Sequence, residues 1–70
     1  MKGMLWLDDS KESLAEKVRQ AVAYMKQKYG SYPSRVFTQA VHESVRVDGI
    51  SVEYMPNILP HHFWLIVGDE

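Results

Sequence analysis

The clearest pattern of apolar and polar positions lies between residues 10 and 30. Apolar side chains recur there at the three- and four-residue spacing of a helix with one buried face. The residues of this stripe are Leu14, Val18, Ala21, Val22, Met25 and Tyr29. Asp9 and Glu12 have the spacing of a capping box, which predicts that Asp9 caps the helix. Gly30, with Pro33 just beyond it, predicts where the helix ends.

Extended segments precede and follow this helix. Residues 3–9 and 34–39 are expected to form strands, and residues 40–44 fit either a turn or a continued strand. Residues 55–60 are bounded by prolines and predict a loop. Residues 62–68 predict a final strand, because the run is apolar without interruption and short.

Residues 44–54 predict a β-hairpin. The Asp48-Gly49 pair favours a two-residue type I′ turn, which sets Val47 opposite Ile50. Apolar and polar residues alternate on both sides of this turn, so one face of the hairpin is expected to be buried. The side chains that share this face are Val45, Val47, Ile50, Val52 and Tyr54.

The predicted order of elements is β-α-β-β-β. This order indicates the α+β class, with one long helix packed on a mixed sheet of four to five strands in two layers. The strands before and after the helix are expected to be parallel. The chain has 70 residues, enough for a single small domain, 1–70.

The last strand is apolar on both sides. Alternation sends Phe63, Leu65 and Val67 to one face of the sheet and Trp64 and Ile66 to the other. A strand of this kind is usually covered on both faces, but the one predicted helix covers only one of them. The sequence therefore predicts a sheet face that the chain leaves open.

A second copy of the chain, most simply in a dimer, or another protein is expected to cover this face. The predicted contact residues are Trp6, Trp64 and Ile66, although the sequence does not say which face the helix takes. A tightly coiled sheet, or a 55–62 loop folded across the tryptophans, would be the alternative. The predicted function is accordingly a non-enzymatic protein–protein interaction or assembly module.

Composition narrows the other classes of function. The chain has no cysteine, which excludes disulfides and thiolate zinc sites. No apolar run is long enough to cross a bilayer, and residues 1–10 lack the apolar core of a signal peptide, so a cytoplasmic location is expected. We predict no cofactor, no membrane partner and no small-molecule substrate.

Two clusters contain residue types that bind metals or act in catalysis. His61 and His62 would point to opposite faces of a strand, but at the end of a loop they could bind one ion, so a metal site that includes His42 stays open. Asp8 and Asp9 stand between a strand and a helix, where carboxylates often bind magnesium, yet helix capping explains them without chemistry. No catalytic or metal-binding residue is predicted.

Charge gives the alternative prediction. Residues 11–35 hold six basic and two acidic residues, a net charge of +4, whereas residues 36–70 have a net charge of −4 without counting histidine. A basic helix face could contact nucleic-acid phosphates. The residues of this alternative are Lys17, Arg19, Lys26 and Lys28.

The segments KYGSYPSRVF, VDGISVEY and LPHHFWLIV resemble a group of small uncharacterised bacterial α+β proteins. In these proteins a helix ends in a Tyr-Gly turn, and the chain closes with a Leu-Pro-x-His-Phe-Trp strand. The resemblance covers about the last two-thirds of the chain. It implies a compact α+β unit from a mobile or phage-like gene neighbourhood, and it implies no activity. The residues that carry it are Tyr29, Gly30, Pro33, Asp48, Gly49, Leu59, Pro60, His62, Phe63 and Trp64.

Overall fold

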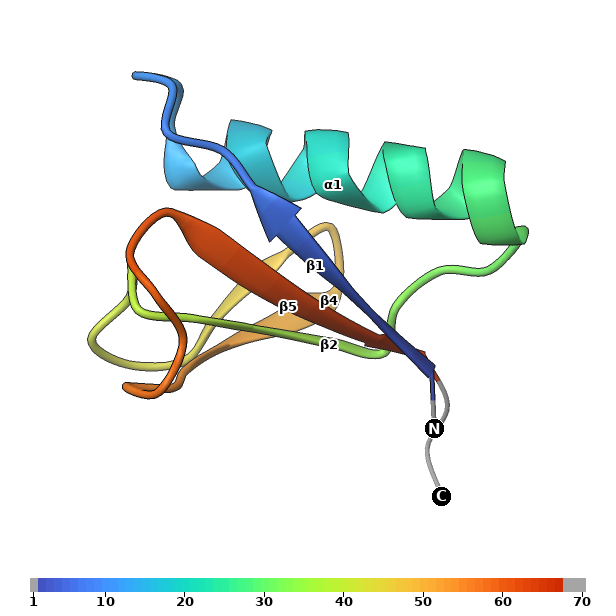
Figure 1. Cartoon of the computed structure of the whole chain (residues 1–70). Helices are drawn as coiled ribbons and strands as arrows, with labels where there is room; N and C mark the ends of the chain where they lie inside the picture. The colour runs from blue at the N-terminus through green and yellow to red at the C-terminus, as the bar shows by residue number, and fades with distance from the viewer. Residues whose placement is uncertain (1, 68–70) are drawn as a thin grey trace.

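One helix lies on one side of a five-stranded sheet in the computed structural model, which describes residues 2–67 (Figure 1). The elements, in chain order, are β1 (Lys2–Leu7), α1 (Leu14–Tyr29), β2 (Arg35–Thr38), β3 (Val45–Val47), β4 (Ile50–Tyr54) and β5 (His62–Val67). The predicted α+β class and element order are confirmed. Gly68, the last residue of the predicted final strand, lies outside the described residues.

The strand order in the sheet is β1-β5-β2-β4-β3. Strand β5 is antiparallel to both of its neighbours, β1 and β2, so these two strands are parallel to each other as predicted. Strands β2 and β4 are parallel, and β4 is antiparallel to β3. The last strand of the chain is therefore inserted between the two strands that the helix connects, and β1 and β3 form the edges.

The hairpin has the predicted turn and register. Asp48 and Gly49 have φ values of 52° and 83°, as a type I′ turn requires at its two central residues. Val47 pairs with Ile50, and the next pair on the same face follows two residues further along each strand. The segment between β2 and β3 is irregular, which settles the ambiguity over residues 40–44 in favour of a connection.

The start of the helix differs from the prediction. Ser13, and not Asp9, is the N-cap: its hydroxyl accepts a hydrogen bond from the backbone N–H of Glu16 at 3.2 Å. The carboxylate of Asp8 accepts the N–H of Ser10 at 2.9 Å and so closes a local turn before the helix. The carboxylate of Asp8 therefore shapes the connection between β1 and α1.

The helix ends at the predicted glycine. Gly30 has a φ of 76°, and its N–H donates to the carbonyl of Lys26 at 2.8 Å. Tyr29, which the pattern placed in the buried stripe, is half-exposed. The helical residues that are fully buried are Val18, Ala21 and Met25.

The core lies between α1 and one face of the sheet. The buried sheet residues alternate along each strand, and Phe63 and Leu65 of β5 face the helix. The sequence had left open whether the helix covers these residues or Trp64 and Ile66. The polar residue Thr38 is also fully buried, and its hydroxyl donates to the carbonyl of His62 at 3.0 Å. The buried apolar residues of the sheet that pack with the helix are Met4, Val36, Val47, Val52, Phe63 and Leu65.

Candidate functional site

The sheet face opposite α1, which we call the open face, takes its side chains from alternate residues of the five strands. On β5 these residues are Trp64 and Ile66, because Phe63 and Leu65 between them point to the helix. The register pairs Leu5 with Trp64, so the alternate residues of β1 point to the same side. The residues of β1, β2 and β5 on this face are Gly3, Leu5, Leu7, Arg35, Phe37, His62, Trp64 and Ile66.

On this face the indole of Trp64 lies over a glycine of edge strand β1. A Cβ atom built on Gly3 would come 2.7 Å from Cη2 of Trp64 and 3.0 Å from its Cε2. The indole therefore fills the space that a side chain at residue 3 would take. Trp64 is half-buried as a result, and Ile66, the cross-strand partner of Gly3, is 7% exposed.

The loop between β4 and β5 lies beside this indole, on the side of the sheet away from α1 (Figure 1). Gln39 holds the loop, because its Nε2 donates to the carbonyls of Pro56 at 3.2 Å and Ile58 at 2.7 Å. The loop and the strands enclose a mostly apolar groove of about 370 Å³. The groove is lined by Leu5, Met55, Asn57, Ile58, Leu59, His62 and Trp64.

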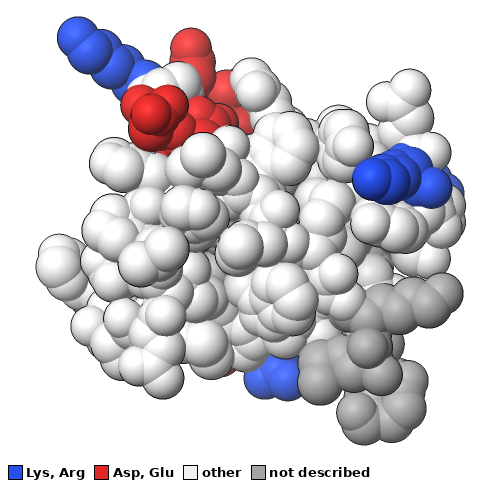
Figure 2. Space-filling view, viewed as in Figure 1, with Lys and Arg blue, Asp and Glu red and all other residues white. Residues whose placement is uncertain are grey.

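Large apolar side chains remain exposed around the groove. Leu5, Leu7 and Leu59 are 56%, 59% and 67% exposed, although aliphatic side chains of this size are normally buried. We call these three leucines and Trp64 the open-face patch. In Figure 2 the side of the molecule on which β1 lies carries few charged groups, and these lie mainly towards the ends of the helix.

The structure brings together only two of the three predicted contact residues. Trp64 and Ile66 share the open face, but Trp6 lies on the opposite face because it pairs with Phe63. The ring of Trp6 packs at 5.2 Å from that of Tyr24 on the helix, measured between ring centroids. The helix thus covers one tryptophan, and the loop borders the other without burying it fully.

The leucines of the patch were not among the predicted contact residues. Leu5 and Leu7 belong to an apolar run, and alternation alone places them on one face. Their position beside Trp64 depends on the pairing of β1 with β5, two strands at opposite ends of the chain. Leu59 lies in a loop, where the strand pattern carries no information about direction.

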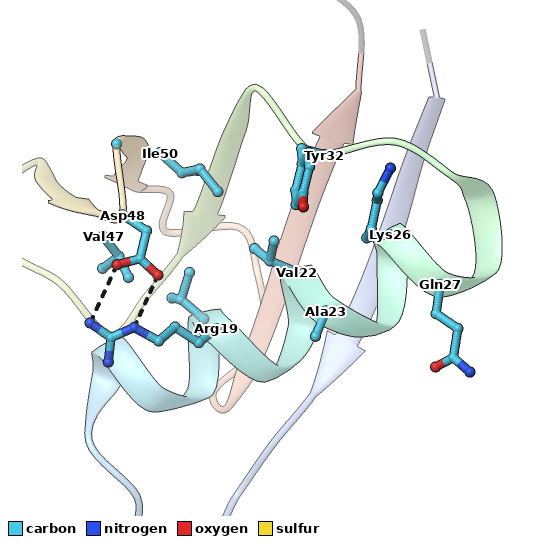
Figure 3. A pocket seen from close by; sticks show the side chains of 11 residues that line it. Arg19, Val22, Ala23, Lys26, Gln27, Tyr32, Val47, Asp48 and Ile50 are labelled. Atoms are coloured by element: carbon cyan, nitrogen blue, oxygen red, sulfur yellow. Dashed lines mark hydrogen bonds and ion pairs between the residues drawn. The ribbon is translucent and has the colours of Figure 1, made fainter.

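A larger groove, of about 680 Å³, lies between α1 and the β3–β4 hairpin (Figure 3). Val22 and Ile50 contribute apolar walls, and the guanidinium of Arg19 bonds the carboxylate of Asp48 through Nε at 3.0 Å and Nη2 at 3.4 Å. Asp48 raises the pKa of Arg19 by this hydrogen bonding and by its charge. The charged groups at this end of the groove are thus already paired with each other.

The four basic residues of the nucleic-acid alternative do not share one helix face. Lys17 and Lys28 are separated by about three turns and lie on one side, whereas Arg19 and Lys26 lie nearly opposite, about half a turn around the axis. Arg19 is engaged with the hairpin, and Nζ of Lys26 stands 5.1 Å from the ring centroid of Tyr32. These side chains therefore form two separate pairs on the two flanks of the helix.

The histidine and aspartate clusters are local structural features. The backbone carbonyl of His61, whose φ is 66°, accepts the N–H of Asp8 at 2.9 Å, and Nδ1 of His62 lies 2.9 Å from the carbonyl of Pro60. Hydrogen bonds from the hydroxyl and the N–H of Ser10 lower the pKa of Asp8. Among residues 2–67, no three His, Asp or Glu side chains are grouped so that they could hold a metal ion.

Comparison of the chain with protein-family models, with curated proteins and with solved structures gives no match. The resemblance to small bacterial α+β proteins consequently stays a prediction. Within the part of the chain that the structure describes, no helix combines the length and the apolar character needed to cross a membrane.

Proposed function

We propose that this chain is a small protein–protein interaction module that associates with a second copy of itself through the open-face patch. The single observation that carries the proposal is the exposure of Leu5, Leu7 and Leu59 around the half-buried Trp64. Contiguous exposed apolar side chains of this kind usually mark a contact surface.

A second copy is the occupant that the chain itself favours. In a two-fold dimer the same patch is used twice, so each exposed leucine meets an equally apolar surface. A 70-residue chain without disulfides also has a small core, and association with a partner subunit is one of the common ways to stabilise such a chain. We also propose a cytoplasmic location, which rests on the absence of cysteine because disulfides rarely form there.

The test is the solution mass at micromolar concentration, measured by light scattering or sedimentation. The unchanged chain is expected at twice the 8.1 kDa of a single copy. Leu59→Glu is expected to give a folded species near 8.1 kDa, because it puts a charge into the contact without disturbing a buried side chain. Far-UV circular dichroism checks the fold of each sample.

Tyr32→Glu is the matched control. Tyr32 is 63% exposed, close to the 67% of Leu59, but it lines the groove between α1 and the hairpin (Figure 3). It is expected to leave the mass unchanged. A single-copy mass for the unchanged chain, or an equal loss of association in both variants, would refute the proposal.

A further inference from the structure

The two edges of the sheet differ in length and in chemistry. Edge strands are usually protected from pairing with other chains by shortness, by charged side chains or by proline. Strand β3 has this protection: it is three residues long and includes the exposed Arg46. Strand β1 is six residues long, and residues 3–7 (GMLWL) contain neither a charge nor a proline.

The hydrogen bonds at the ends of β5 show which groups of β1 are free to pair. The N–H of Asp8 donates to the carbonyl of His61, so the residues of β1 that bond β5 are expected to alternate from Asp8. The carbonyls of His62 and Ile66 accept bonds from the β2 side of the sheet, which fits the same alternation. The N–H and C=O groups of Gly3, Leu5 and Leu7 therefore point outward from the edge.

We propose that β1 of one copy pairs antiparallel with β1 of a second copy, so that both sheets join into one. This inference rests on the proposed function, because it specifies how the second copy meets the β1 residues of the patch. The residues with outward backbone groups are also the β1 residues whose side chains lie on the open face. One pairing thus satisfies the backbone of the edge and brings Leu5 and Leu7 of the two copies together.

The alternation of outward-facing residues and residues bonded to β5 along β1 determines the register of the pairing. Outward-facing residues must oppose outward-facing residues, and only pairing centred on Leu5 uses all of them. Leu5 then stands opposite Leu5 of the second copy, and Gly3 stands opposite Leu7 of the second copy. A shift by one residue would set outward-facing groups against groups that already bond β5.

This register joins the two apolar patches. Leu7 of the second copy comes beside Gly3, over which the indole of Trp64 lies. The same contact recurs on the other side of the two-fold axis, since the interface is self-complementary. Each Trp64 is thus bordered by its own loop on one side and by the second copy's leucine on the other.

Disulfide trapping tests the register, because the chain has no cysteine of its own. In the proposed pairing the two Leu5 Cα atoms are about 5.5 Å apart, within the range of a disulfide. The two Leu7 Cα atoms are displaced by two residues in opposite directions and lie about 14 Å apart, beyond that range. Leu5→Cys and Leu7→Cys are matched variants, since these side chains are 56% and 59% exposed.

Under mild oxidation at micromolar concentration, Leu5→Cys is expected to form a covalent dimer at least about tenfold faster than Leu7→Cys. The products are separated on a non-reducing gel, and urea is added to a parallel sample to show the rate without folded pairing. Equal rates for the two variants in the folded state, or a faster reaction of Leu7→Cys, would overturn the proposed pairing.

Leu5→Pro separates this inference from the proposed function. Proline removes the outward N–H at residue 5 and keeps an apolar side chain, and edge strands accept it where the N–H faces solvent. It is expected to give a folded single copy, with Leu5→Val as the control that stays dimeric. A Leu5→Pro dimer that Leu59→Glu still dissociates would reject edge pairing and keep the open-face contact. If Leu5→Pro does not fold, the comparison of cysteine variants decides.

Discussion

The indole of Trp64 lies over the backbone of Gly3, on the neighbouring strand of the sheet. The register pairs Trp64 with Leu5 and Gly3 with Ile66, so the indole leans along β5 to reach a diagonal neighbour. An aromatic ring that covers a glycine on an edge strand shields the exposed backbone and fixes the register. This contact fixes the position of Trp64 on the open face, and the leucines of the patch remain exposed around it.

Gly3→Ala is expected to destabilise the fold by about 1–3 kcal/mol, the usual range for a side chain forced into filled space. The added methyl group would lie 2.7 Å from Cη2 of Trp64, and the ring cannot move away without losing its contact with β1. Urea unfolding followed by circular dichroism measures the change in the free energy of unfolding.

The same substitution in a Trp64→Leu background is the control. The smaller side chain leaves room for the methyl group, so Gly3→Ala is expected to cost less than about 0.5 kcal/mol there. The two substitutions are not additive in the free energy of unfolding, because the two residues are in contact. An equal cost in both backgrounds would mean that the collision with the indole is not the cause.

The cap of the helix gives a second pair of variants. Ser13→Ala is expected to lower the free energy of unfolding by about 1 kcal/mol, because it removes the acceptor for the N–H of Glu16. Asp9→Ala, which alters the cap that the sequence pattern favoured, is expected to change it by less than about 0.5 kcal/mol. The two variants are compared by thermal or urea unfolding. A larger loss in the free energy of unfolding for Asp9→Ala than for Ser13→Ala would identify Asp9 as the cap.

The hairpin turn and the helix cap show which features a local sequence pattern can predict. The Asp48-Gly49 turn was predictable because the left-handed conformation of two adjacent residues is a local property that few residue types accept. The cap was not, because Asp9 with Glu12 and Ser13 with Glu16 have the same spacing. Which of them caps the helix depends on where Leu14 first meets the sheet, and that is a tertiary contact.

The sequence predicted that an apolar contact surface exists, but it did not predict all the residues that form it. The sequence showed that β5 has apolar side chains on both faces, and that one helix cannot cover both Phe63 and Leu65 on one face and Trp64 and Ile66 on the other. The leucines of β1 joined them only through the pairing of the first strand with the last, and Trp6 was lost through the same pairing. Loop residues such as Leu59 follow no alternation, so only the hydrogen bonds that hold the loop fix where they point.

Acid is expected to remove a contribution of Asp8 to stability. Hydrogen bonds from Ser10 lower the pKa of Asp8 in the folded chain below the ordinary value of 3.8. The ionised carboxylate therefore stabilises the fold above pH 3.8, and this contribution is lost as the pH falls through the lower, folded-state pKa. Asp8→Asn is expected to have a lower urea midpoint than the unchanged chain at pH 7, and the same midpoint well below pH 3.8. Asp9→Asn controls for the change in net charge, and a difference that persists in acid would contradict the assignment.

The loop that borders the patch depends on one amide. Gln39→Glu replaces the donor that bonds the carbonyls of Pro56 and Ile58 with a carboxylate that repels both oxygens. The loop is expected to open, so amide exchange at Ile58 and His62, whose N–H groups bond carbonyls within the loop, should become at least about tenfold faster. Hydrogen exchange followed by mass spectrometry or NMR measures this change. Gln20→Glu, on the exposed side of α1, introduces the same charge and is expected to leave these rates unaltered. Because the loop carries Leu59, an opened loop should also weaken association, and a Gln39→Glu variant that exchanges faster yet associates as before would remove Leu59 from the contact.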